Sequence, residues 1–153
     1  MDPSPLPAAI DALVASITST SLTITNFIRA VRSARADLAA VTRELADLCL
    51  VLELLRDDHV VPTRMQPRVR AVLRCCAVIL ARVSALAAAA SPNNGPGDAT
   101  RARWSVKEKS EMVQLWIALQ TYREALGLID EVAHLCVFPR PSRRRPSVMC
   151  RAY

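Results

Sequence analysis

The chain has 153 residues, enough for one domain with a sizeable core, and 52% of them are hydrophobic although only 4% are aromatic and only 3 are glycine. So few glycines and aromatics argue against a β-sandwich or barrel and favour helices packed by aliphatic side chains. The net charge is +6, but five arginines fall within residues 139–153, where there is no acid, and the remaining chain holds 15 basic and 14 acidic residues. A nearly neutral body argues against a nucleic-acid-binding domain, which needs a basic face on the fold itself.

The five cysteines favour a reducing, intracellular compartment. Their number is odd, no two have CxxC spacing, and Cys49 and Cys136 fall within helical patterns, where a free cysteine acts as a small apolar residue. The N-terminus lacks the basic segment of a secretory signal, and Asp11 interrupts its apolar stretch. The longest apolar run, residues 71–90, contains two arginines, which predicts a core helix rather than a membrane span. We expect a cytoplasmic location, with a peripheral-membrane or nuclear location as the alternatives.

A seven-residue apolar repeat runs through residues 8–61. This stretch contains no glycine or proline and is followed by Pro62. Such a repeat predicts either one long coiled-coil helix or two helices that fold back on each other. Because globular helices rarely exceed about 25 residues, we predict two antiparallel helices, at about 6–32 and 34–57. The first column of the repeat is Ile10, Ile17, Ile24, Val31, Leu38, Leu45 and Leu52, and the second is Leu13, Thr20, Phe27, Ala34, Val41, Leu48 and Leu55.

A third helix is predicted to follow Pro62 and to reach about Ala89. Residues 63–66, Thr-Arg-Met-Gln, have the form of a capping box, in which Thr63 and Gln66 satisfy free backbone N–H groups. Arg70, Arg74 and Arg82 are expected to share a solvent-facing side of this helix. The predicted core positions are Val69, Val72, Leu73, Cys76, Ile79, Leu80, Val83 and Leu86.

The last helix is predicted at about 106–137, after a loop at 91–103 that gathers the turn-forming residues. Residues 105–108, Ser-Val-Lys-Glu, form a second capping box, and Lys107 and Glu111 have the spacing of a helical ion pair. Its predicted core positions are Met112, Leu115, Leu119, Tyr122, Leu126, Ile129, Ala133 and Cys136. The expected fold class is therefore all-α: a bundle of about four main helices in residues 1–138, followed by a disordered, Arg-rich tail in residues 139–153.

The sequence of residues 26–55 resembles that of a known family. They read Asn-Phe-Ile-Arg-Ala-Val-Arg from Asn26, then Asp37-Leu38, Arg43-Glu44-Leu45 and the leucine-rich end at Leu52–Leu55. This pattern resembles the helical N-terminal domain of fungal NACHT/STAND-type proteins, a domain type that also occurs in the azaphilone pigment biosynthesis cluster protein L. The resemblance covers roughly residues 1–137, and it implies a bundle related to HeLo-like domains.

The function that the resemblance implies is that of a non-enzymatic interaction and signalling module that acts through protein–protein association. The expected partner is a protein, either a second copy of the chain or a STAND-type receptor, and not a small-molecule substrate. The alternative is a HeLo-like membrane-active domain linked to programmed cell death. The uncharged, hydroxyl-rich segment 16–25 fits that alternative, although the absence of Lys and Arg before Arg29 weakens attraction to anionic lipid.

Catalytic and metal-binding candidates are few. Asp57, Asp58 and His59 are adjacent, Cys75 with His59 is a conceivable nucleophile pair, and Arg74 could lower the pKa of a thiol of Cys75 or Cys76. No second cluster stands at a usable spacing, and no flanking motif supports a nucleophile. We therefore expect no enzymatic activity, no cofactor and no metal site, and we expect the two adjacent cysteines to be buried in the core.

The candidate interface residues are the aromatic side chains Phe27, Trp104 and Trp116, because aromatic residues anchor many interfaces. The tail carries a different candidate. Arg143, Arg144 and Arg145 precede Ser147 in the form of a basophilic kinase site, and a phosphate adds about −1.5 to −2 charges among the arginines. This arrangement predicts a charge switch that binds anionic membrane or nucleic acid weakly and releases it on phosphorylation; an inert, solubilising end is the alternative.

Overall fold

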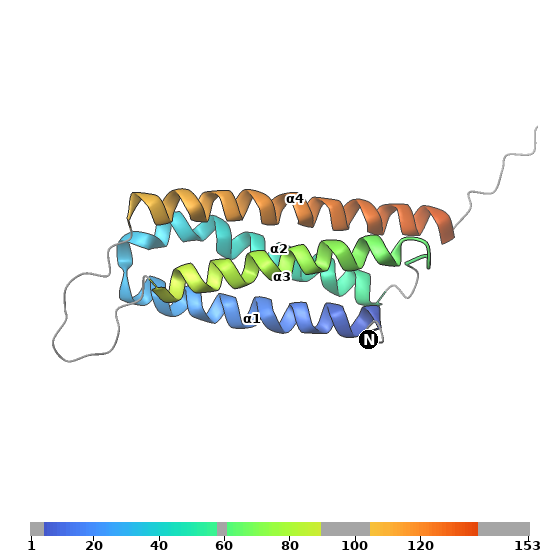
Figure 1. Cartoon of the computed structure of the whole chain (residues 1–153), viewed down its shortest axis with the longest axis horizontal. Coiled ribbons are helices and arrows are strands. Elements are labelled where there is room, and N and C mark those ends of the chain that lie inside the picture. Colours follow the sequence, from blue (N-terminus) through green and yellow to red (C-terminus); the bar gives the residue numbers. More distant parts are fainter. Residues whose placement is uncertain (1–4, 58–60, 90–104, 138–153) are drawn as a thin grey trace, which may run out of the picture.

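The chain folds into a bundle of α-helices that run alternately up and down (Figure 1). This computed structural model describes residues 5–57, 61–89 and 105–137, and its helices all lie within these ranges. The predicted all-α class, the four main helices and the break of the long repeat into two antiparallel helices are confirmed. The elements are α1 (Leu6–Ala30), a 3₁₀ turn η1 (Arg32–Ala34), α2 (Arg35–Asp57), α3 (Gln66–Ala89) and α4 (Val106–Val137).

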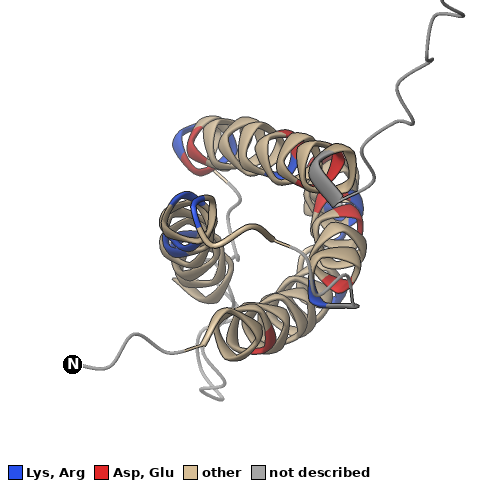
Figure 2. Ribbon diagram, turned by 90° about the vertical axis from the view of Figure 1, so that its right-hand side faces the viewer, with Lys and Arg blue, Asp and Glu red and all other residues tan. Residues whose placement is uncertain are grey.

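The helices close a ring in the order α1–α2–α4–α3 (Figure 2). α1 packs against α2 and α3, α4 packs against the same two helices, and the diagonal pairs do not meet within the described residues. α2 and α3 are therefore consecutive helices that lie diagonally across the bundle. As a result α1 and α3 are parallel neighbours, as are α2 and α4, whereas the other two neighbouring pairs are antiparallel (Figure 1).

The core is built on the seven-residue repeat, because every residue of its two columns is buried. The repeat keeps its phase through the turn between α1 and α2. There the N–H of Val31 donates to the carbonyl of Phe27 at 2.8 Å, and the N–H of Ala34 donates to that of Val31 at 3.0 Å. Val31 and Ala34 are themselves buried, so the turn belongs to the seam. The predicted core positions of α3, and those of α4 whose side chains are described, are buried or half-buried as well.

The two predicted capping boxes have different outcomes. Ser105 and Glu108 form theirs: the N–H of Ser105 donates to Glu108 Oε2 at 2.8 Å, and the N–H of Glu108 donates to Ser105 Oγ at 3.3 Å. The box predicted for Thr63 is wrong, since within the described residues its side chain makes no hydrogen bond. The carbonyl of Met65 instead accepts the N–H groups of Arg68 and Val69, so α3 begins at Gln66 after a tight turn.

Ion pairs join three of the four neighbouring helix pairs. Arg56 Nη1 on α2 lies 3.3 Å from Asp11 Oδ1 on α1, and Lys109 Nζ on α4 lies 3.0 Å from Asp37 Oδ2 on α2. Arg82 on α3 pairs with Glu111 on α4. The pairing predicted between Lys107 and Glu111 is therefore wrong, because a cation from the neighbouring helix takes the carboxylate.

The pair formed by Glu44 and Arg123 differs from the others because it is largely shielded from water. Arg123 Nε donates to Glu44 Oε1 at 2.5 Å, and the side chains are only 26% and 8% exposed, respectively. The hydrogen bond to Glu44 raises the pKa of Arg123. A carboxylate so far from water needs its cation, because a buried charge without a partner is strongly unfavourable. The pair therefore fixes α4 against α2.

We predict that Arg123→Met destabilises the fold by about 2–4 kcal/mol, because it leaves the Glu44 carboxylate buried without a cation. The matched substitution Arg56→Met, in the exposed pair with Asp11, should cost below about 1 kcal/mol. The free energy of unfolding in urea measures both. Glu44→Leu combined with Arg123→Met should recover most of the loss. Equal effects of the two Arg→Met changes would contradict a special role for the buried pair.

Candidate functional site

Of the residues predicted as interface or switch candidates, Phe27 and Trp116 lie within the described part of the chain. Phe27 is completely buried in the core, so the folded bundle leaves it no surface to offer a partner. Trp116 is half-buried, packs against the core and lies where α2 and α4 meet, beside Asp37 and Lys109. Outside the described residues lie Trp104, Arg143, Arg144, Arg145 and Ser147.

The two adjacent cysteines have different environments, so the expectation that both are buried is wrong for one of them. Cys75 is exposed on α3, whereas Cys76 is fully buried in the core. Burial raises the pKa of Cys76 to about 12, the opposite of the lowering that Arg74 could have produced. The pKa of Cys49 on α2 is also raised, first by burial and then by Glu53. Neither Cys49 nor Cys76 has the environment of an activated nucleophile.

Of the remaining catalytic candidates, Asp57 lies within the described residues, at the end of α2. Within the described ranges there is no group of three or more His, Cys, Asp or Glu side chains that could hold a metal ion. Asp58 and His59 lie outside those ranges. The ring of His134 is engaged by its own helix, where Nδ1 lies 3.0 Å from the carbonyl oxygen and 3.5 Å from the carboxylate of Asp130.

Among the described residues, exposed apolar side chains recur along the outer face of α4. Its core positions recur every seven residues from Met112, and a second set of apolar side chains lies between them. Spacings of three, four, seven and eleven residues place this second set on one side of a helix, opposite the core. We call it the α4 outer stripe, and it consists of the exposed residues Val106, Val113, Ile117, Leu128, Val132 and Leu135.

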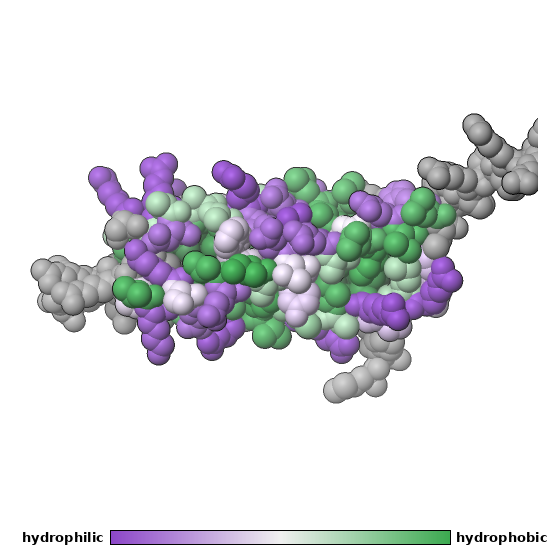
Figure 3. Space-filling model, turned by 90° about the horizontal axis from the view of Figure 1, so that it is seen from above, coloured by the Kyte–Doolittle hydropathy of each residue, from purple (hydrophilic) through white to green (hydrophobic). Residues whose placement is uncertain are grey.

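The second half of α2, a helix that neighbours α4, also carries exposed apolar side chains. Leu50 and Leu54 are exposed one turn apart in the second half of α2, and α2 runs parallel to α4. Figure 3 looks down on α4, and hydrophobic side chains gather there over its C-terminal half, while hydrophilic ones dominate its first half. The spacing of the stripe residues in the sequence is typical of one side of a helix. The core positions of the same helix have the same kind of spacing, and only the core positions were predicted.

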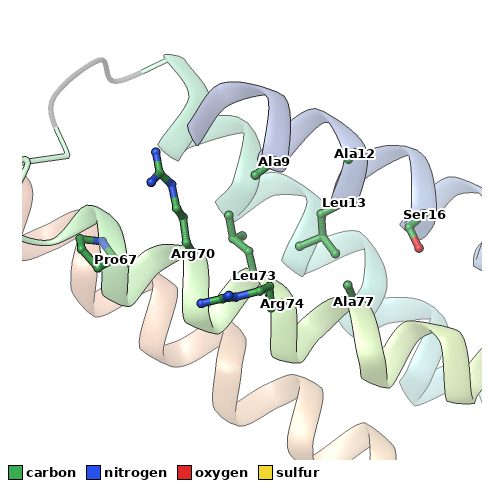
Figure 4. A pocket seen from close by; sticks show the side chains of 9 residues that line it. All are labelled: Ala9, Ala12, Leu13, Ser16, Pro67, Arg70, Leu73, Arg74 and Ala77. Carbon is green, nitrogen blue, oxygen red and sulfur yellow. The ribbon is translucent and has the colours of Figure 1, made fainter. Parts of the chain in front are cut away.

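A second surface feature is a groove between the first halves of α1 and α3, with a volume of about 570 Å³ (Figure 4). Its deepest side chains are Leu13 and Leu73, both almost fully buried. The small side chains of Ala9, Ala12 and Ala77 line its sides. The groove exists because alanines stand where larger residues would fill the space between the two helices. Sequence analysis could not find it, since it depends on which helices are neighbours.

Two arginines from α3, Arg70 and Arg74, also line the groove (Figure 4). Neither has an acidic partner within the described residues, and the Nε of Arg70 is buried without a hydrogen-bond acceptor. Asp11 is the one acid of α1, and its carboxylate binds Arg56 on α2. The contact between α1 and α3 thus combines apolar packing with uncompensated positive charge, which Figure 2 shows as basic residues at the start of α3.

α1 has unusual polar chemistry for an exposed helix. Its threonine hydroxyls donate to carbonyl oxygens four residues earlier, at 2.8–3.1 Å, so each hydroxyl has an acceptor within the helix. Residues 12–28 carry no charge. By length and composition α1 and α3 are the two described helices that could cross a membrane, a test that the core helix of a soluble protein also passes. The threonines whose hydroxyls donate to carbonyl oxygens within α1 are Thr18, Thr20, Thr23 and Thr25.

Comparisons with protein-family models, with curated proteins and with solved structures found no match to this chain. The class that the fold defines is an up-and-down four-helix bundle.

We predict that iodoacetamide at pH 8 modifies Cys75 in the folded protein while Cys76 stays protected. Cys75 is exposed, whereas Cys76 is buried and its pKa of about 12 leaves only about 10⁻⁴ of its thiol as the reactive thiolate. Fragment-ion mass spectrometry distinguishes the adjacent cysteines. Protection should disappear in urea. Alkylation of Cys76 at the rate of Cys75 without unfolding would contradict the assigned packing of α3.

Proposed function

We propose that the protein is a non-enzymatic interaction module that associates with other helices through the α4 outer stripe. The supporting observation is that exposed apolar side chains recur along the outer side of α4, opposite the face that the bundle covers. An exposed apolar face of this length is costly in water, and such faces commonly mark interaction sites. The proposal agrees with the signalling role that the resemblance to fungal STAND-protein N-terminal domains implies.

The pattern of the stripe supports a second copy of the chain as the partner. Val106 and Leu135 are equally far from the midpoint between Gln120 and Thr121, and so are Val113 and Leu128. In an antiparallel pair of α4 helices related by a two-fold axis, Val106 therefore meets Leu135 of the other copy and Val113 meets Leu128, whereas Ile117 and Val132 face Glu124 and Lys109. Such self-complementarity is what an isologous dimer interface requires.

The charges beside the stripe favour the same antiparallel pairing. Lys107 and Lys109 lie at the start of α4, whereas Glu124 and Glu131 lie in its second half. An antiparallel arrangement brings these lysines of one helix towards these glutamates of the other, and a parallel arrangement brings like charges together. α4 has 32 residues and is about 48 Å long, which is sufficient for a dimer interface of ordinary size.

Sedimentation velocity over a range of concentrations tests the proposal. We expect a reversible dimer that Leu128→Glu abolishes, because the substitution places two carboxylates in an apolar contact. Leu22→Glu on α1 is the matched control: Leu22 is 61% exposed and Leu128 is 62% exposed, so both variants should keep the wild-type melting temperature. A protein that is monomeric at every concentration, or equal effects of the two variants, would refute self-association through α4.

The threonine hydroxyls of α1 donate to backbone carbonyls of their own helix, and this favours membrane insertion as a second candidate function. A helix without charges in residues 12–28, whose threonine hydroxyls bond to its own backbone, needs no water partners for these groups. Insertion would require α1 to leave the bundle, because its apolar face is buried against α2 and α3. That requirement separates this function from association through α4.

We predict for the membrane function that the wild type releases dye from vesicles of phosphatidylcholine and phosphatidylserine, and that Leu22→Glu suppresses the release. A glutamate in the middle of the uncharged segment makes insertion unfavourable by a few kcal/mol. Leu128→Glu is the control here and should leave the release unchanged. The same two variants thus distinguish the functions, and intact vesicles with wild-type protein would rule out the membrane function under these conditions.

A further inference from the structure

The groove between α1 and α3 is separate from the proposed association surface. It lies where these two helices begin, on the side of the bundle formed by α1 and α3 (Figure 4). The α4 outer stripe faces away from the core on a different helix. None of its lining residues belongs to α2 or α4. A ligand in this groove would therefore not compete with a partner on α4.

The dimensions of the groove fit a small molecule rather than a protein. Its volume of about 570 Å³ is within the usual range of small-molecule sites. Along α1 it extends from Ala9 to Ser16, which is two helical turns or about 10 Å. A stable protein interface is considerably larger than a two-turn groove can provide. The lining of leucine and alanine favours a narrow aliphatic chain as the occupant.

The arginines of the groove require an anion at one end of that chain. Arg70 and Arg74 are one turn apart on α3, and Figure 4 shows both side chains at the same end of the groove. The described residues offer them no carboxylate, and the buried Nε of Arg70 lacks an acceptor, an arrangement that costs free energy. A carboxylate entering the groove would give this guanidinium an acceptor, with two parallel N–H···O bonds once the side chain turns towards it.

The start of α3 strengthens this preference. Its first turn contains no acid, and Arg68, Arg70 and Arg74 all lie within its first three turns. The N-terminal end of a helix carries a partial positive charge, so cations there are unfavourable and an anion is stabilised. Apolar walls, two arginines without acidic partners and a positive helix end thus surround the same space.

We propose that this groove binds a medium-chain fatty acid, with the aliphatic chain along Leu13 and Leu73 and the carboxylate between Arg70 and Arg74. The chain removes apolar surface from water at both ligand and protein, which favours binding in proportion to the area buried. The carboxylate neutralises positive charge that the described part of the bundle leaves uncompensated. The fatty acid acts as a ligand that stabilises α1 against α3, not as a substrate.

The probe for the test is dodecanoate labelled with ¹³C at its carboxyl carbon, titrated into the full chain below its micelle concentration. Calorimetry gives the affinity, the ¹³C shift reports on the carboxylate, and amide shifts of Ala9, Ala12 and Ala77 locate the chain. We expect Arg70→Gln combined with Arg74→Gln to weaken binding about tenfold or more, because two charge-assisted contacts are lost. Arg68→Gln, which removes one positive charge close by but outside the groove lining, should change affinity by less than about twofold.

A second pair of variants tests the position of the chain. Ala77→Leu fills the groove from an exposed position and should weaken binding strongly, whereas Ala81→Leu, one turn along α3 and outside the lining, should not. Circular dichroism confirms that each variant is folded. Methyl dodecanoate or dodecyl phosphate binding more tightly than dodecanoate would overturn the assigned carboxylate. Unchanged affinity in the arginine double variant, or in Ala77→Leu, would overturn the site.

Discussion

The bundle depends on the seven-residue seam that α1 and α2 share without interruption. Both columns of the repeat are buried along both helices, and the turn between them keeps the phase because Val31 and Ala34 occupy seam positions themselves. A turn that shifted the phase would move the apolar positions of one helix away from the core. The antiparallel pair therefore acts as the fixed half of the bundle, against which α3 and α4 bury their own apolar faces.

The second half of the bundle is placed by two different kinds of contact. α4 is fixed on α2 by polar contacts, of which the shielded pair of Glu44 and Arg123 is the most demanding, since either charge alone would be unfavourable there. α3 is held on α1 by apolar packing, and no ion pair joins these two helices within the described residues. This difference explains why an apolar groove with unpaired arginines lies on the side of α1 and α3, and not between α2 and α4.

The two proposed sites follow from this asymmetry. α4 has apolar residues on two faces, and the four-helix ring can cover only one of them, so its other face is available to a second copy. The groove, in contrast, results from alanines between parallel helices and from arginines that the neighbouring helix does not neutralise. A ligand there would add to the contact between α1 and α3, the one neighbouring pair without an ion pair in the described part of the chain. Ligand binding would thus stabilise the helix that the membrane function must release.

The sequence by itself determined the helical class, the helix ends to within a few residues and nearly all of the core, because apolar spacing reports directly which side of a helix is buried. It also determined the cap at Ser105, a local interaction between residues three apart. It could not determine which helices are neighbours, since the order α1–α2–α4–α3 depends on how whole faces pack. For that reason only the tertiary structure decided that Glu111 pairs with Arg82 instead of Lys107, that Arg123 shields Glu44, and that Cys75 is exposed. The same packing decided where the groove lies, because its two walls are more than fifty residues apart in the chain and meet only in the folded bundle.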